Sequence, residues 1–172
     1  DKITLIHAHN DASFGHLHGL PRDGRAPYVR GRELQAYAAA GIRSDHETSS
    51  LREAEGRLAA GMGLMLSEGS AARNLLDLVP AVTPETAEFC MLCTDDRQPA
   101  DLLGEGGINY LVKLLRDDGR IPLPGILRMA SLNAARFFSL RETGAVAPGY
   151  RADFALYPNL ASWKPTHVWG EG

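Results

Sequence analysis

Residues 41–47 of the 172-residue chain read Gly-Ile-Arg-Ser-Asp-His-Glu, an apolar run that ends abruptly in polar side chains. Residues 89–97 repeat this arrangement as Phe-Cys-Met-Leu-Cys-Thr-Asp-Asp-Arg. In parallel α/β proteins the reactive side chains lie at the carboxyl ends of strands, where the loops begin. His46 and Asp95 are therefore candidates to share a divalent cation, because imidazole and carboxylate both bind such ions. The alternative is that His46 is a hydrogen-bonded structural residue.

Strand and helix patterns alternate along the chain. Strands are expected over residues 3–6, 42–44, 64–66 and 89–93, and helices over residues 31–40, 50–60, 99–114 and 124–138. Ser50 and Glu53 have capping-box spacing, Ser70 is expected to cap a short helix, and Pro84 is expected to begin another. This alternation predicts an α/β fold with a parallel sheet.

The predicted architecture is a partial, half TIM-type β/α barrel plus a small C-terminal β element. A complete barrel takes about 250 residues, so a chain of 172 residues holds about four βα units. Residues 1–140 would form the half-barrel domain, and residues 141–172 would form a β segment of a composite small domain. The outer strands of half a barrel lack neighbours. We therefore expect a homodimer or a complementing half as partner.

The composition is that of an ordinary soluble domain, with 44% hydrophobic and 23% charged residues and a formal net charge of -3. The 18 lysines and arginines are scattered, which argues against nucleic acid as a partner. No apolar stretch approaches the roughly 20 residues of a membrane span, and no signal-peptide pattern opens the chain. These features predict a cytoplasmic protein without a membrane partner. Cys90 and Cys93 are expected to be buried and reduced.

Five blocks of sequence carry a resemblance that spans nearly the whole chain. They occupy residues 23–27, 40–47, 68–75, 93–97 and 144–153. In order and spacing they resemble the second half of the bacterial adenine deaminases, which belong to the amidohydrolase superfamily. The resemblance implies a (β/α)8 barrel with a small β-domain. It also implies one or two divalent metals, typically manganese or iron, that activate a water against C6 of adenine.

The same resemblance implies roles for individual residues. His46 and Asp95 would bind metal, and Asp95 would also handle the proton of the attacking water. Asp96 would join Asp95 as a catalytic residue and help to hold the purine. Arg25, Glu68 and Ser70 would lie on the substrate side of the site, and residue 153 would buttress structure.

Several polar positions depart from the family pattern. The family's Asp-Gly-His-Ala-Pro carries a metal-binding histidine where this chain has Arg25, and a guanidinium has no lone pair to offer a metal. Ser67 replaces an arginine, and Gln98 and Gly107 each replace a histidine of the family. The family's earlier His-x-His pair and glutamate have no match at the family's spacing. The altered ligand set leaves open that no metal is bound here.

His7 and His9 have the spacing of a metal-binding pair, and His16 and His18 extend a local histidine-rich patch. Only a short stretch separates His9 from Asp23, too short for a strand–helix crossover. A polar N-terminal segment is the competing interpretation.

Three functions remain open from the sequence. The first is a catalytically impaired or silent relative of adenine deaminase that serves as a binding or assembly protein. The second is an active metal-dependent adenine deaminase that releases ammonia to give hypoxanthine. The third is one piece of a longer or split enzyme.

Overall fold

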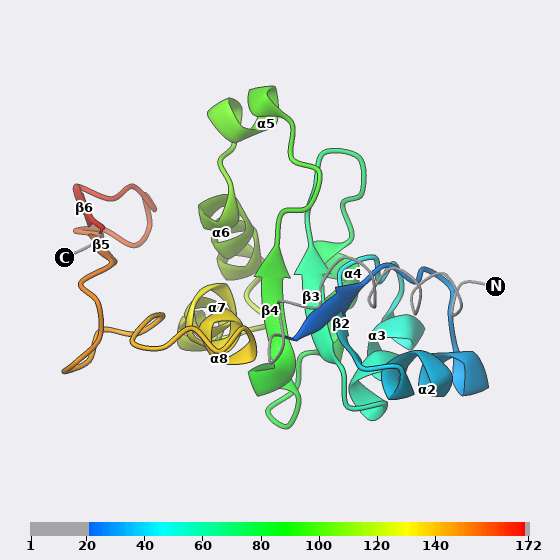
Figure 1. The fold of residues 1–172 in the computed structure, drawn as a ribbon. Helices are drawn as coiled ribbons and strands as arrows, with labels where there is room; N and C mark the ends of the chain where they lie inside the picture. The colour runs from blue at the N-terminus through cyan, green and yellow to red at the C-terminus, as the bar shows by residue number, and fades with distance from the viewer. Residues whose placement is uncertain (1–20, 171–172) are drawn as a thin grey trace.

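The computed structural model describes residues 21–170, and its centre is a four-stranded parallel sheet (Figure 1). The strands are adjacent in chain order: β1 (Arg22–Gly24), β2 (Ile42–Asp45), β3 (Gly63–Ser67) and β4 (Cys90–Cys93). Successive parallel strands joined by helices are the repeating unit of a TIM-type barrel. The prediction of an α/β fold with a partial barrel is confirmed. The strand expected at residues 3–6 lies outside the described residues.

At least one helix follows each strand of the parallel sheet. These are α2 (Gly31–Ala39), α3 (Leu51–Ala59), α4 (Leu75–Leu78), and then α5 (Pro99–Gly104) and α6 (Ile108–Asp118) after β4. Two more helices, α7 (Leu123–Ala130) and α8 (Leu132–Phe137), pack beside β4. Figure 1 shows α2 and α3 on one flank of the sheet and α6 to α8 on the other.

The main core lies between β3, β4 and the helices that follow them. Leu64 and Leu66 of β3 are fully buried there with Leu111 and Leu115 of α6. Each such side chain stabilises the fold by roughly 2 kcal/mol on burial. A smaller core holds Tyr37 and its neighbours from α2, under β1 and β2. The two cores fix the strands, and through them the side chains at the strand ends.

Two of the expected long helices are each divided. The first separates into α5 and α6 at Gly106, whose φ of +111° favours glycine. The second separates into α7 and α8 at Ser131, whose hydroxyl donates to the carbonyl oxygen of Leu127 at 2.6 Å. A serine that bonds back one turn competes with the helical ladder, so helical periodicity alone did not reveal this break.

One local prediction was right in position only, and two were wrong. Ser50 lies at the N-cap of α3, but its hydroxyl makes no cap hydrogen bond there. Ser70 caps no helix, because α4 begins only after Asn74. Pro84 lies in a turn, and a short 3₁₀ helix begins later, at Ala87. In the last two cases the helix starts later than the sequence pattern favours.

A short antiparallel hairpin ends the described chain. It consists of β5 (Phe154–Leu156) and β6 (His167–Trp169), and all its residues are exposed. Figure 1 shows it beyond α6 to α8, away from the parallel sheet. The intervening segment contacts α6 where Trp163 donates from its indole nitrogen to the carbonyl oxygen of Asn109 at 2.9 Å.

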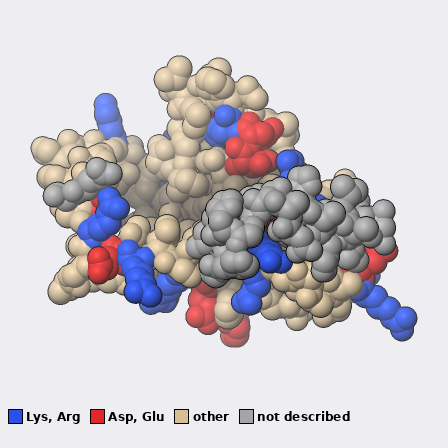
Figure 2. Space-filling model, in the orientation of Figure 1, with Lys and Arg blue, Asp and Glu red and all other residues tan. Residues whose placement is uncertain are grey.

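The cysteines, the surface charge and the helix lengths bear on three further predictions from the sequence. Cys90 is buried and Cys93 is partly buried, and both are free thiols. On the face in Figure 2, basic and acidic side chains are interspersed and no broad basic area forms. Among residues 21–170, no helix has the length and apolar character required to cross a bilayer.

Candidate functional site

His46 lies between two carboxylates at the carboxyl ends of the strands. Its Nδ1 is hydrogen-bonded to Oδ2 of Asp23, the middle residue of β1. Its Nε2 is 3.8 Å from Oδ1 of Asp95, in the loop after β4. Ser44 donates from its hydroxyl to the other oxygen of Asp23 at 2.7 Å. Both oxygens of this carboxylate are therefore hydrogen-bonded, which fixes its orientation. The strand ends therefore hold one imidazole in a defined orientation.

The electrostatics of this group follow from its contacts. The hydrogen bond with Asp23 raises the pKa of His46, burial opposes this, and the charges of Asp23, Asp95 and Asp45 raise it further. Burial pushes the pKa of Asp23 upward, but hydrogen bonds from His46 and Ser44 hold it below its usual value. When Nδ1 donates to Asp23, Nε2 faces a second carboxylate. A proton on Nε2 or a cation between the two groups favours that approach.

Arg25 provides a fixed positive charge at the same edge. Its Nε and Nη2 lie 2.9 and 2.5 Å from Oε1 of Glu47. This hydrogen bond is the first cause of a raised pKa at Arg25, and the charges of Asp95 and Asp23 add to it. The guanidinium thus compensates carboxylates that would otherwise repel one another.

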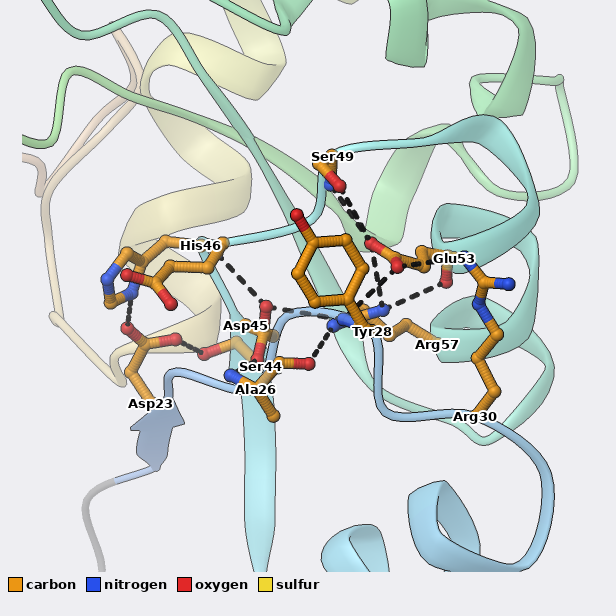
Figure 3. Close-up of polar contacts among 11 residues, drawn as sticks. Asp23, Ala26, Tyr28, Arg30, Ser44, Asp45, His46, Ser49, Glu53 and Arg57 are labelled. Carbon is orange, nitrogen blue, oxygen red and sulfur yellow. Dashed lines mark hydrogen bonds and ion pairs between the residues drawn. The ribbon is translucent and has the colours of Figure 1, made fainter. Parts of the chain in front are cut away.

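A buried ion network supports the loop that carries Arg25 (Figure 3). Asp45 is fully buried and accepts from the backbone N–H groups of Ala26 at 2.9 Å and Glu47 at 3.0 Å. Arg57 of α3, also fully buried, lies 3.3 Å from Asp45 and donates to the carbonyl oxygen of Ala26 at 2.7 Å. Removing one member of such a pair leaves an uncompensated buried charge. The network therefore fixes the loop after β1 relative to β2.

Glu53 extends this network to the exposed Tyr28. Its Oε1 accepts from the backbone N–H of Tyr28 at 3.1 Å, and its Oε2 accepts from that of Ser49 at 3.1 Å. Tyr28 has a φ of +67° and leaves 73% of its surface exposed. An aromatic residue in the left-handed region is strained, so the hydrogen bond to a buried carboxylate holds an unfavourable backbone geometry in place.

Asp96 is hydrogen-bonded to the loop after β3. Its Oδ1 accepts from the backbone N–H of Ser70 at 3.2 Å. The hydroxyl of Ser70 donates to Asp101 and accepts from the backbone N–H of Gln98 at 2.8 Å. The loops after β3 and β4 cross closely at Gly69. A side chain there would prevent this, because a Cβ would lie 2.0 Å from Oδ1 of Asp96. Asp96 and Ser70 therefore join two loops.

Glu68 and Arg97 are buried beside that crossing. Glu68 accepts from the backbone N–H of Leu75 at 3.3 Å, at the start of α4, and burial raises its pKa above the usual value. Arg97 donates to the carbonyl oxygen of Gly106 at 2.9 Å, pairs with Glu105, and stacks over the ring of Tyr110 at 4.5 Å. These contacts anchor the loop after β4 to α6.

The resemblance implies a metal, and two of the described side chains at the strand ends could contact one. His46 Nε2 and Asp95 Oδ1 are close enough for one ion, with ligand distances of roughly 2 Å, to contact both. Within residues 21–170, no third His, Cys, Asp or Glu completes a group that could hold a metal. The nearby carboxylate of Asp23 is turned to Nδ1 instead. His46 and Asp95 would hold the ion, but the described donors do not form a sufficient set.

The structure brings some of the sequence-predicted residues together and separates others. His46, Asp95 and Arg25 lie at one edge, whereas Asp96, Glu68 and Ser70 make loop and helix contacts. Sequence reasoning missed Asp23, although it too precedes a loop at a strand end. It also missed the buried network of Asp45, Glu53 and Arg57. His7, His9, His16 and His18 lie outside the described residues.

The fold and this site define a class: a β/α-barrel-type protein with polar groups at its strand ends. A model of the amidohydrolase family matches residues 2–168. The chain belongs to the amidohydrolase family.

Its relatives include proteins named adenine deaminase. The chain is 51% identical over 150 residues to adenine deaminase 2 of Carboxydothermus hydrogenoformans, covering 87% of this chain and 26% of that protein. It is 46% identical over 150 residues to adenine deaminase of Desulfatibacillum aliphaticivorans, with the same two coverages. Adenine deaminase of Thermosipho africanus is 46% identical over 142 residues, covering 83% and 25%. The chain spans about a quarter of the length of these curated relatives.

Proposed function

We propose that the 172-residue chain is an adenine deaminase-related protein that does not deaminate adenine by itself. The observation that carries this proposal is the ion pair of Arg25 with Glu47 beside His46. A guanidinium at this edge supplies charge without a lone pair, so it neutralises carboxylates and ligates nothing. Metal affinity depends on a full set of deprotonated ligands.

In this proposal the strand-end residues bind and orient rather than activate water. Asp23 fixes the ring of His46, and His46 presents Nε2 toward Asp95. Arg25 balances the carboxylates on the same edge. A bound metal, where present, would supply the hydroxide that the family reaction needs. The two donors described here, His46 and Asp95, are fewer than the three protein ligands of a typical catalytic zinc site.

Metal binding by the purified chain tests this proposal. Equilibrium dialysis against manganese or iron, followed by elemental analysis, should give well below one ion per chain at micromolar free metal. The H46A variant is the control, because it removes one of the two described donors. A stoichiometric ion that is lost in H46A would contradict the proposal.

The alternative is an active metal-dependent adenine deaminase within a longer or split enzyme. The contact of His46 with Asp23 favours it, since metal-binding histidines commonly donate their other ring nitrogen to a carboxylate. A chimera tests it: this chain replaces the matching 150-residue segment of the Carboxydothermus relative. Adenine deamination by the chimera would support the alternative. An inactive chimera that recovers activity with R25H would instead assign the loss to Arg25.

We also propose that the protein is cytoplasmic and pairs through its sheet edges. In the described sheet, β1 pairs only with β2 and β4 only with β3, so each has one free edge. A second copy or a complementing half would supply the missing neighbours. Sedimentation at micromolar concentration should show a dimer of the chain, and a monomer at all concentrations would exclude self-pairing.

A further inference from the structure

A second concave site lies at the opposite end of the sheet. It has a cavity volume of about 270 Å³, close to the lower limit of roughly 300 Å³ for small-molecule pockets. Its walls come from the start of β2, the glycine-rich turn into β3, the start of β4 and the helix α8. The strand-end cluster of His46 occupies the carboxyl ends of the same strands. The two sites are therefore separated by the length of the sheet.

Asn133 places an unpaired acceptor in this pocket. Only 4% of its surface is exposed. Its Nδ2 donates to the carbonyl oxygens of Ala87 at 2.8 Å and Cys90 at 2.9 Å, which uses both amide hydrogens. Within the described residues its Oδ1 accepts no hydrogen bond, and the residue lines the cavity. A carbonyl oxygen that keeps its acceptor capacity on an otherwise buried residue suits a ligand N–H or O–H.

Two arginines give the mouth of the pocket a positive charge. Arg43 projects from β2 and Arg136 from α8, and Glu88 is the one acidic group among the described lining residues. Neither arginine has a hydrogen bond or ion pair to another residue in the range 21–170. Two free guanidiniums against one carboxylate leave a net charge of about +1, which favours an anion.

The inner wall of the pocket is apolar and partly aromatic. Phe89, Phe137 and Met91 line it together with Gly63. A Cβ at Gly63 would lie 3.0 Å from both Met91 and Phe137, so the absence of a side chain permits their close packing. Phe89 remains 53% exposed beside the cavity. Two aromatic rings in the lining offer a stacking surface for a flat ligand.

We propose that this pocket binds a nucleoside monophosphate, a flat nitrogenous ring that carries an anionic group. The ring packs against Phe89 and Phe137 and donates an N–H to Oδ1 of Asn133. The phosphate lies at the mouth and is held by Arg43 and Arg136. This site is independent of the strand-end cluster and of any deaminase activity.

Isothermal titration of the 172-residue chain with AMP tests the proposal. Binding should be saturable at one site and should weaken with salt. Adenosine, which lacks the anion, and inorganic phosphate, which lacks the ring, should each bind at least about tenfold more weakly. R43Q and R136Q should each lower AMP affinity about tenfold, since each removes a charge-assisted contact.

Two variants separate this site from the rest of the surface. R128Q changes an exposed arginine of α7 that does not line the pocket, and its AMP affinity should match that of the wild type. H46A alters the strand-end cluster and should also leave AMP affinity unchanged. Equal affinities of R43Q, R136Q and R128Q, a loss of binding in H46A, or no binding at millimolar AMP would each overturn the proposal.

Discussion

Nδ1 of His46 is hydrogen-bonded to Oδ2 of Asp23, and this contact ties the loop after β2 to β1. It also determines which ring nitrogen is free, because the carboxylate can only accept from Nδ1. Nε2 then faces Asp95, which follows β4, the strand at the other edge of the sheet. Side chains from the first, second and fourth strands thus converge on one imidazole.

Replacing Arg25 should change the metal chemistry of this edge. In R25H the imidazole adds a lone-pair donor, and Glu47 loses its guanidinium partner. We expect manganese affinity, measured by equilibrium dialysis, to rise at least about tenfold. R25K is the matched control, because it keeps the charge and adds no ligand at neutral pH. An affinity in R25H that equals that of R25K would show that residue 25 does not limit metal binding.

Glu53 should make stability depend on pH. Burial raises its pKa, but hydrogen bonds from Ser49 and Arg30 and the charge of Arg57 bring it below its usual value. A carboxyl with a lowered folded-state pKa stabilises the fold above its unfolded pKa of roughly 4.3, and this stability is lost as pH falls through the folded value. E53Q should lower the free energy of unfolding by about 3 kcal/mol at pH 7.

Urea unfolding at several pH values measures this effect. The difference in free energy of unfolding between wild type and E53Q should become smaller as pH falls below about 4. In E55Q, an exposed change on the same helix, the free energy of unfolding should stay within about 0.5 kcal/mol of that of the wild type. A difference between wild type and E53Q that is constant with pH would show that the charge of Glu53 is not what stabilises the loop.

Gly69 should tolerate no side chain. In G69A the new Cβ would meet Oδ1 of Asp96 at 2.0 Å and the carbonyl oxygen of Thr94 at 3.3 Å. Asp96 must then move away from the backbone N–H of Ser70, and we expect a loss of about 1–3 kcal/mol in thermal or urea unfolding. G104A is the control, since a Cβ at Gly104 meets nothing within 4 Å. Equal stability of the two variants would refute the close crossing of these loops.

Trp163 should hold the C-terminal segment on α6. Its indole donates to Asn109, its ring stacks on Tyr157 with centroids 4.6 Å apart, and the guanidinium of Arg116 lies 5.6 Å from it. W163A should speed limited proteolysis after residue 140 several-fold while the half-barrel remains intact. W169A, which alters the exposed hairpin, should have a smaller effect. Cleavage within the sheet in W163A would contradict the predicted boundary near residue 140.

The parallel sheet could be predicted from sequence because its determinants are local. Residues 89–93 are apolar without interruption, as a strand buried on both faces requires, and β4 forms there. Gly41, with a φ of +90°, ends the helix before β2 where the pattern placed its stop. Short-range rules therefore recovered β2, β3, β4 and most helix positions, but β1 (Arg22–Gly24) was not among the expected strands.

The site was harder to predict because its contacts are long-range. The strand-end rule selected His46 and Asp95 but gave no sign that Asp23 would take Nδ1. Likewise, nothing in the local sequence of Arg57 indicates complete burial beside Asp45. Arginine is rarely buried unless it is paired, and the pairing is visible only once α3 is packed against β3.

Ammonia release from adenine by the purified 172-residue chain tests the central claim most directly. The assay contains manganese or iron and no other protein, and a full-length adenine deaminase serves as positive control. We predict no ammonia release above that of buffer alone. Arg25 adds charge without a ligand, and the described residues bring together only two metal donors, His46 and Asp95. Sustained release at about one turnover per second or faster, the range of ordinary enzymes, would contradict the claim.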